Sequence, residues 1–382
     1  MALTLHGTVS DNTVVLSRPN ATPVIYNGDM LLAQRGTSAT SITGGGYPTV
    51  DRFYMSMLSA GTFTQTQSTD VPTGQGFTKS LKWDCTTANG SLGAGSYLLP
   101  LEQHFEGQDL QLLRKGTSSA KGITIAFWIK SNLTGNFNLE IWDRENDRQI
   151  TKAVTINSAN TWEKKVSSFP ADTTGTLTAD NSNRLQIALW AGGGTNFTSG
   201  GSLQTSWGAI THTKRAYNTV NLASSTDNEL YITGVQLEIG EFDSNSIPDF
   251  QFEDASTSLA RCQRYFQKSF PQGTAPQNYG SYVGGQSDAG IGAVMSSTEY
   301  KVVINFKCEM RSAPTMAFYK AQNTPTDGEW TYWDGGDNLD PTSMGSNPQS
   351  HRVTVVMGFS GGGKNTGRAG LTQGNYTAAA EI

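Results

Sequence analysis

The sequence predicts an all-β fold, and three observations lead to this prediction. Glycine accounts for 42 of the 382 residues, whereas Asp, Glu, Lys and Arg together make up only 15%. Glycine permits tight reversals, and threonine and aromatic side chains fit the pleated surface of a sheet. Short runs of apolar and polar residues alternate and are bounded by Gly, Asn, Asp or Ser. We therefore expect a two-sheet jelly-roll sandwich, followed by a smaller C-terminal β module and preceded by a short N-terminal arm.

The predicted jelly roll occupies residues 25–242. One helical turn is expected in QDLQLLRKG, which ends at Gly116 after two basic residues, as helix C-termini prefer. Eight or more strands over this length suit a jelly roll. The clearest expected strands are residues 51–58, 79–85, 122–131, 136–143, 148–156, 161–169, 184–192 and 229–240.

Two shorter regions flank this domain. Residues 1–24 form an arm that is too short to bury a core, so we expect it to dock on a neighbouring chain or a larger body. Ser, Asn, Asp and Pro cluster in residues 243–255, which we interpret as a linker. Residues 256–382 then form the second module, with strands expected at 291–297, 300–310, 315–321, 329–334, 351–359 and 376–382.

Composition also bears on the partners and the cell compartment. The net charge is −5 and no basic stretch appears, which argues against a nucleic-acid partner. No apolar run approaches 18 residues, and the first ten residues lack the regions of a signal peptide, so we expect no membrane insertion and assembly in a cytoplasm. The three cysteines are far apart in the chain and are interpreted as free, buried thiols.

Alternation along three predicted strands identifies candidate sugar-binding residues. Apolar residues at every second position form the inward faces, so three tryptophans fall on the polar faces with charged or amide neighbours. Such a face can hold a sugar, because a ring stacks on the pyranose while polar groups bind its hydroxyls. The alternative is that loops, the helical turn or another subunit cover these rings. The candidates are Trp128, Trp142, Trp190, Glu140, Arg144 and Gln186.

Trp83 follows the opposite pattern. It alternates with Leu81 and Cys85 in the predicted strand at residues 79–85, so we expect it in the core.

The segment GFSGGGKN, which begins at Gly358, has the spacing of a phosphate-binding loop without its chemistry. Asn365 stands where the magnesium-binding Ser or Thr belongs, and the glycine-rich segment that follows disfavours the required helix. We interpret it as a connecting loop. Our hypothesis is that residues 361–370, with Lys364 and Arg368, lie at the exposed end of the second module and contact the host.

Two sets of short motifs carry a family resemblance. NGDMLLAQRG, SLKWDC and YITGVQLEIGE resemble segments of carbohydrate-binding modules with a galactose-binding-like jelly roll. The ordered set NGDM, QRGTS, DRF, FWIKS, INSANTW, YITGVQLEIG and ARCQRYFQ resembles tailed-bacteriophage fibre and virion structural proteins. The likeness covers roughly residues 27–270, and it departs at Phe53, where Trp is expected.

This resemblance implies a homotrimeric, non-enzymatic virion component that contacts a glycan or protein on the host surface. The arm would then dock on other virion proteins, and the protein would be located on the phage tail or capsid. The alternative that we keep is a capsid decoration protein or head fibre without glycan binding. An enzyme is not expected, because the four histidines are scattered and no H-E-x-x-H or G-x-S-x-G motif is present.

The resemblance also implies a structural calcium ion in some related modules, between the two ends of the jelly roll. The corresponding residues are Asn27, Asp29 and Glu238, and calcium prefers such oxygen ligands. A capped turn is the alternative interpretation. No cofactor is required by either interpretation.

Overall fold

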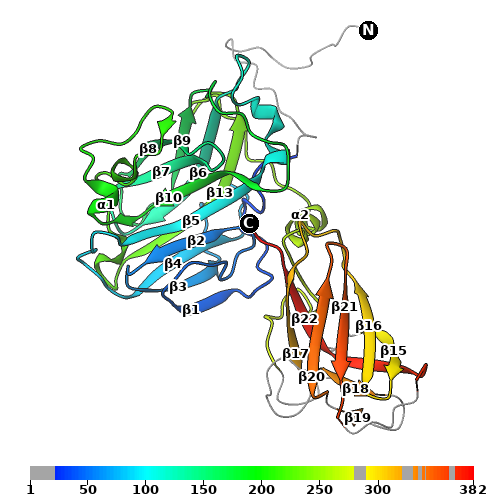
Figure 1. The fold of residues 1–382 in the computed structure, drawn as a ribbon. Coiled ribbons are helices and arrows are strands. Elements are labelled where there is room, and N and C mark those ends of the chain that lie inside the picture. The colour runs from blue at the N-terminus through cyan, green and yellow to red at the C-terminus, as the bar shows by residue number, and fades with distance from the viewer. Residues whose placement is uncertain (1–21, 279–289, 321–329, 334–337, 340, 361–365) are drawn as a thin grey trace.

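The computed structural model describes residues 22–278, 290–320, 330–333, 338–339, 341–360 and 366–382. It consists of two β modules that meet at a short helix, α2 (Ala255–Gln263), with the last residues of the chain at the same junction (Figure 1). The prediction of an all-β fold with a jelly-roll sandwich is confirmed.

The jelly roll is built from two antiparallel sheets. The six-stranded sheet has the order β1-β3-β4-β13-β6-β9, and the other has the order β11-β5-β10-β7-β8-β12 with β2 paired to β5. The first sheet comprises β1 (Ser38–Ile42), β3 (Thr62–Ser68), β4 (Ser80–Thr87), β13 (Glu229–Ile239), β6 (Ile123–Ser131) and β9 (Glu163–Phe169). The second comprises β11 (Gly192–Gly193), β5 (Tyr97–Glu106), β10 (Asn183–Trp190), β7 (Gly135–Asp143), β8 (Arg148–Ile156), β12 (Gly208–Ala209) and β2 (Tyr54–Leu58).

The predicted inward faces of these strands form the core between the sheets. Every second residue of β6, β7 and β10 belongs to one hydrophobic cluster, and burying each large side chain contributes roughly 1.5–3 kcal/mol. Trp83 lies in the same cluster with no exposed surface, as predicted. The alternating cluster members are Ile123, Ile125, Phe127, Ile129, Phe137, Leu139, Ile141, Leu185, Ile187 and Leu189.

Strand β5 was not predicted, and Pro100 explains why. Proline has no N–H for a ladder and is unexpected inside a central strand. Here β5 accommodates it with a bulge against β2, because Tyr54 pairs with Glu102 while Ser56 pairs with Leu99. The strand thereby keeps its pairing with β10 on the other side.

The predicted helical turn is only partly correct. The segment forms two 3-10 turns, η1 (Gly107–Asp109) and η2 (Gln111–Leu113), where one helical turn was expected. The chain then reverses at Gly116, whose φ of +79° is accessible to glycine without strain.

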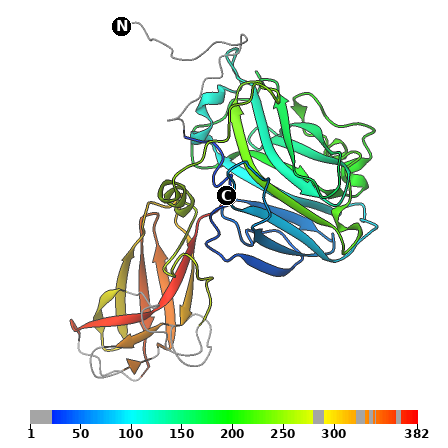
Figure 2. The same ribbon diagram turned by 180° about the vertical axis from the view of Figure 1, so that it is seen from behind.

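The C-terminal module has its own core and is organised around one long strand, β22 (Ala369–Ala379). Figure 2 shows this strand running from the far end of the module to the junction. Its partners are β14 (Phe266–Lys268), β15 (Ile291–Ser296), β17 (Thr315–Lys320) and β18 (Thr331–Trp333). The sheet continues through β16 (Glu299–Asn305), β21 (Arg352–Gly358) and β20 (Ser343–Pro348), and β19 (Asn338–Leu339) pairs with β18.

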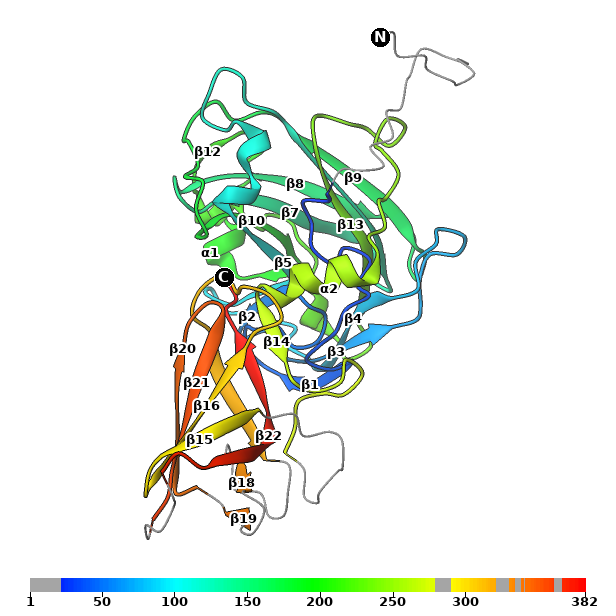
Figure 3. The same cartoon turned by 90° about the vertical axis from the view of Figure 1, so that its right-hand side faces the viewer.

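Helix α2 was not predicted either, although the sequence contains its start signal. Asp254 accepts hydrogen bonds from the backbone N–H groups of Ser256 and Thr257, which is the usual N-cap arrangement. Two smaller helical elements lie near the cleft described below: α1 (Thr195–Thr198) and η3 (His212–Lys214). Figure 3 shows α2 lying between the two modules.

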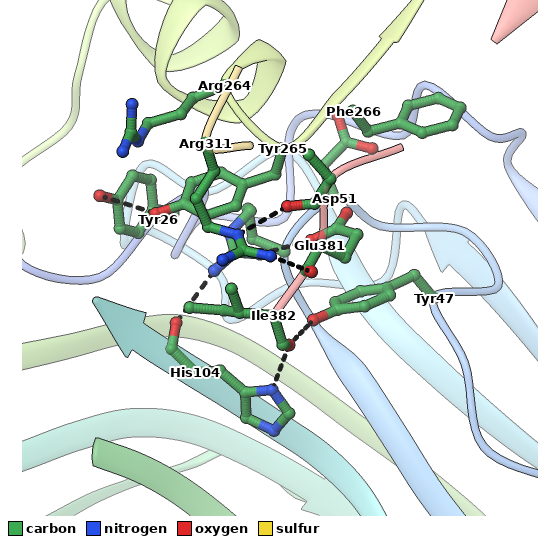
Figure 4. A network of polar contacts seen from close by, with 12 residues as sticks. Tyr26, Tyr47, Asp51, His104, Arg264, Tyr265, Phe266, Arg311, Glu381 and Ile382 are labelled. Carbon is green, nitrogen blue, oxygen red and sulfur yellow. Dashed lines mark hydrogen bonds and ion pairs between the residues drawn. The ribbon is translucent and has the colours of Figure 1, made fainter. Parts of the chain in front are cut away.

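A polar network joins the modules at this helix (Figure 4). The guanidinium of Arg52, which is almost fully buried in the jelly roll, forms an ion pair with Glu381 and donates to the carbonyl of His104. Its Cζ atom also lies 3.5 Å from the ring centroid of Tyr265. Arg264, at the end of α2, forms a bidentate pair with Glu106 at the end of β5 in the jelly roll. The 243–255 segment is therefore not the only physical connection between the modules.

Candidate functional site: a cleft on the seven-stranded sheet

A cleft of about 490 Å³ lies on the outward face of the seven-stranded sheet. Its walls combine aromatic rings with charged and amide side chains, which is the composition of many small-ligand sites. The lining residues are Tyr54, Ser56, Tyr97, Leu99, Glu102, His104, Trp142, Arg144, Asn183, Gln186, Trp190, Phe197, His212, Arg215 and Ile382.

Strand pairing explains why these residues meet. On β10, Gln186 is directly opposite Trp142 of β7 on one side and His104 of β5 on the other. Two residues further along β10, Ala188 is opposite both Glu140 and Glu102. Because alternate residues of a strand share a face, these cross-strand rows all lie on the side away from the core.

Glu140 occupies the most buried position of this face. It has no exposed surface, and Arg215 holds it with a bidentate pair at 2.8 Å for both N–O contacts. The indole N–H of Trp190 donates to the same carboxylate at 2.9 Å. The charge and the acceptor capacity of Glu140 are thus taken up within the protein, so this residue supports the cleft rather than contacting a ligand.

Glu102 is the second carboxylate of the cleft and also has protein partners. Its Oε2 accepts a hydrogen bond from the Gln186 amide and lies 3.2 Å from His104 Nε2. The other ring nitrogen of His104 contacts the carbonyl oxygen of Ile382, which also accepts from the Tyr47 hydroxyl (Figure 4). A chain of polar contacts therefore runs from the module junction into the cleft.

Trp142 is half-buried in the cleft, and two arginines lie over its ring. The Cζ atom of Arg144 lies 3.8 Å from its ring centroid and that of Arg215 lies 4.6 Å away. The Trp142 indole N–H is buried without a hydrogen-bond partner among the described residues, and so is the Asn183 side-chain oxygen. One donor and one acceptor of residues that line the cleft are therefore left unused by the described part of the protein.

The predicted sugar-binding set divides into three groups. Trp142, Arg144 and Gln186 line the cleft together. Trp128 does not, because β6 belongs to the six-stranded sheet, whose outward face is on the other side of the sandwich. The three tryptophans therefore do not share one surface, since local alternation does not tell which strands become neighbours.

Trp190 lies under other side chains and is only 1% exposed. Phe197 and Tyr97 contact its ring, with centroids 5.2 and 6.5 Å away, and Arg215 also lies near it. The long connection between β10 and β13 supplies Phe197 and Arg215. The sequence left open that a loop covers this ring, and the structure shows such a covered ring. Trp190 therefore supports the cleft from beneath, together with Glu140.

Most of the other lining residues were missed from the sequence. Glu102 and His104 lie on β5, a strand that was not predicted because it contains Pro100. Tyr54 lies on the neighbouring strand β2. Phe197, His212 and Arg215 come from the long connection, where no strand alternation exists to assign a face. The alternation of Glu102 and His104 was the one available signal, because both fall on the same side of any strand through residues 97–106.

The predicted calcium ligands lie beside a second cavity, of about 520 Å³, which Asn27, Asp29 and Glu238 help to line. The Asn27 amide already donates to the carbonyls of Leu32 and Asp51 and accepts from the Leu32 N–H, so the capped turn describes this residue. Among the described residues, no three His, Cys, Asp or Glu side chains cluster in a way that could hold a metal ion. Calcium binding stays a prediction, with Asp29 and Glu238 as its carboxylates.

The predicted host-contact loop is only partly covered by the structure. Lys364 lies outside the described residues, whereas Arg368 is exposed and its carbonyl accepts a hydrogen bond from the Val294 N–H. A strand, β22, begins directly after it, so the helix that a phosphate-binding loop requires does not follow.

Comparison with known proteins finds solved structures that match at low identity. No family model and no curated protein sequence matches the chain. Among solved structures, a putative sugar-binding protein from Bacteroides thetaiotaomicron matches 57% of this chain over its whole length, with 11% identity and a TM-score of 0.31. A xylan-binding domain from Paenibacillus barcinonensis matches 59% of this chain over its whole length, with 8% identity and a TM-score of 0.27.

A phage protein is also among the similar structures. The enzymatically active domain of tailspike protein 4 from bacteriophage CBA120 matches 57% of this chain, with 12% identity and a TM-score of 0.30. This chain covers only 21% of that structure. At these identities and TM-scores the similarities do not assign a function. In the part of the chain that the structure describes, no helix has the length and apolar character needed to cross a membrane.

Proposed function

We propose that this protein binds glycans without modifying them, through the cleft on the seven-stranded sheet, and serves as a host-attachment fibre protein of a tailed-phage virion. The observation that carries glycan binding is the half-buried indole of Trp142, which lies in the cleft among polar side chains with an unpartnered N–H. An aromatic ring beside such groups can contact the C–H face of a pyranose while the polar groups bind its hydroxyls.

The virion part of the proposal rests on the ordered sequence motifs that resemble phage fibre proteins. We propose a homotrimer whose N-terminal arm docks on other virion proteins. A trimer presents three clefts, so weak individual sites could still give firm attachment through avidity.

An apolar sheet face in the C-terminal module supports the trimer. Four of the large hydrophobic side chains that are exposed in the described chain point outward from β15, β16 and β22, which are neighbours in the sheet. Exposed apolar side chains on neighbouring strands are suited to contact between subunits. These residues are Ile291, Met295, Val303 and Leu371.

The alternative function is a capsid decoration protein or head fibre without glycan binding. The packing around Trp190 favours it, because Phe197, Tyr97 and Arg215 fill part of the sheet face that could otherwise hold a sugar. Imaging of virions with labelled protein separates the two functions, since a tail location supports the first and a head location the second.

The test of glycan binding is the substitution Trp142→Ala, measured on a glycan array and on intact host cells. Loss of one aromatic contact with the sugar is expected to weaken binding about 3- to 10-fold. Trp128→Ala is the matched control, because this half-buried tryptophan lies on the other sheet and does not line the cleft. Unchanged binding by a correctly folded Trp142→Ala protein would exclude the cleft as the sugar site.

A further inference from the structure

One charged side chain of the cleft lacks an opposite charge in contact with it. Arg144 follows β7 and lies on the same face as Trp142, and its backbone N–H donates to the Arg184 carbonyl at 3.0 Å. Among the described residues, its guanidinium forms no hydrogen bond and no ion pair. It is held instead over the Trp142 ring, 3.8 Å from the centroid, which leaves its N–H edge available.

The two carboxylates of the cleft do not fill this role. Glu140 is bound by Arg215 and Trp190, and Glu102 accepts from Gln186 and contacts His104. Arg144 therefore differs from Arg215, the other arginine of the cleft, whose charge is neutralised in a bidentate pair. A planar guanidinium with an unused edge is suited to a carboxylate, because two parallel N–H donors match its two oxygens.

The surroundings of Arg144 also favour an added negative charge. Partial burial, together with the neighbouring positive charge of Arg215, lowers the pKa of Arg144 below its ordinary value. The protein environment thus disfavours this cation as it stands, and a bound anion would offset that effect. Trp142 and Asn183 line the same cleft, and each has a buried polar atom, Nε1 and Oδ1 respectively, without a partner among the described residues.

We infer that the cleft selects acidic glycans, with Arg144 binding the carboxylate of a uronic acid in bidentate fashion while Trp142 and Asn183 contact the sugar ring and its hydroxyls. This inference rests on the proposed glycan-binding function and specifies its ligand class. It makes Arg144 a specificity-determining residue rather than a general support of the cleft.

The experiment uses the full chain and an array of uronic-acid oligosaccharides of different linkages. Each is printed beside its carboxyl-reduced form, which differs only in a hydroxymethyl group where the carboxylate was. The wild-type protein is expected to bind at least one acidic oligosaccharide about tenfold or more tightly than its reduced form, and this preference should weaken at high salt. Arg144→Gln should abolish the preference, so that the acidic form and its reduced form bind with equal affinity.

Two further variants make the result specific. Arg144→Lys keeps the charge but loses the fork of donors, so it should retain only part of the preference. Arg114→Gln is the matched control, because it removes one exposed positive charge of the same domain outside the cleft and should preserve the full preference. Thermal unfolding of each variant verifies that the fold is intact.

The outcomes distinguish the two levels of the proposal. If the wild-type protein binds acidic and reduced forms equally, glycan binding stands and the inference about Arg144 is overturned. The inference about Arg144 is also overturned if Arg144→Gln keeps the preference for the acidic form. It is overturned as well if this substitution weakens binding of the acidic and the reduced form to the same extent. If the wild-type protein binds no oligosaccharide of either kind, the proposed function fails and the inference fails with it.

Discussion

Asp51 is a carboxylate that water scarcely reaches, with 1% of its surface exposed. The backbone N–H and the side-chain amide of Gln34 donate to it, at 3.1 and 2.8 Å, and Arg35 lies 3.6 Å away. Burial nevertheless dominates and raises the pKa of Asp51 to about 6, with Arg35 opposing the shift. Beside the module junction, the protein thus contains a carboxyl group that becomes protonated at a higher pH than an exposed aspartate does.

This residue predicts a pH dependence of stability. Because its pKa is higher in the folded than in the unfolded chain, its contribution to stability is fully present below about pH 4 and is lost as pH rises through about 6. We expect the free energy of unfolding of wild type, relative to Asp51→Asn, to fall on the order of 2 kcal/mol across this window. Urea unfolding at several pH values measures the difference.

Asp84→Asn, a substitution on the surface of β4, is the control for this experiment and should show no such trend. A wild-type minus Asp51→Asn difference that is constant between pH 4 and pH 6.5 would contradict the assignment.

At the scale of elements, the C-terminal module depends on close contact between β22 and buried aromatic rings. A Cβ atom added at Gly374 would lie 2.0 Å from Cδ1 of Trp330, whose ring is fully buried and donates to the Asn375 carbonyl. Glycine is needed at position 374 because the Trp330 ring occupies the space that any larger side chain would fill. Strand alternation alone could not reveal this requirement.

We expect Gly374→Ala to destabilise the C-terminal module by about 1 to 3 kcal/mol, because the Trp330 ring must shift within a packed core. Urea unfolding followed by tryptophan fluorescence measures the effect. Gly345→Ala on β20 is the matched control, as a Cβ atom there meets open space and should change stability by less than about 0.5 kcal/mol. Equal effects of the two substitutions would refute the packing argument.

At the scale of the whole molecule, the network around Arg52 couples the two modules. Glu381 pairs with both Arg52 and Arg35 of the jelly roll, and Arg311 binds the carbonyls of Ala380 and Glu381. The end of β22 is thereby held against the strand that contributes His104 to the cleft (Figure 4). The contacts that hold the second module in place therefore also reach His104, a residue that lines the cleft.

Removal of this buried ion pair should loosen the junction. Arg52→Met leaves Glu381 with one partner in place of two, at an expected cost of about 3 kcal/mol. We expect small-angle scattering to show a wider range of module orientations. Lys301→Met, which removes a half-exposed pair with Glu299 on β16, is the control and should cost about 0 to 1 kcal/mol. Unchanged scattering of a folded Arg52→Met protein would show that the Arg52–Glu381 pair does not set the orientation.

The proposed trimer is tested at the same scale. Val303 is 49% exposed on the apolar sheet face, so Val303→Asp should place a charge in the subunit interface. Light scattering coupled to size-exclusion chromatography is expected to give three chains for wild type and one for the variant. Leu58→Asp, at an exposed leucine of the jelly roll, should leave the trimer intact. A monomeric wild-type protein would rule out the trimer.

Local pattern was sufficient for the class of fold and for the inward face of most long strands, because side-chain direction in a strand repeats every two residues and needs no distant partner. On that basis the core positions of β6, β7 and β10 and the burial of Trp83 were predicted correctly. Strands β1, β3 and β5 and helix α2 were not among the expected elements. Pro100 interrupts the pattern of β5, and α2 is short.

The composition of the site depended on contacts between residues far apart in the chain. Trp128 and Trp142 have the same local pattern, yet pairing places them in different sheets, and only Trp142 meets Glu102, His104 and Asn183. Trp190 has that pattern too, but the connection after β10 covers it. Alternation specifies a face of a strand, whereas the neighbours of that face follow from long-range pairing and loop packing, which no short window of sequence contains.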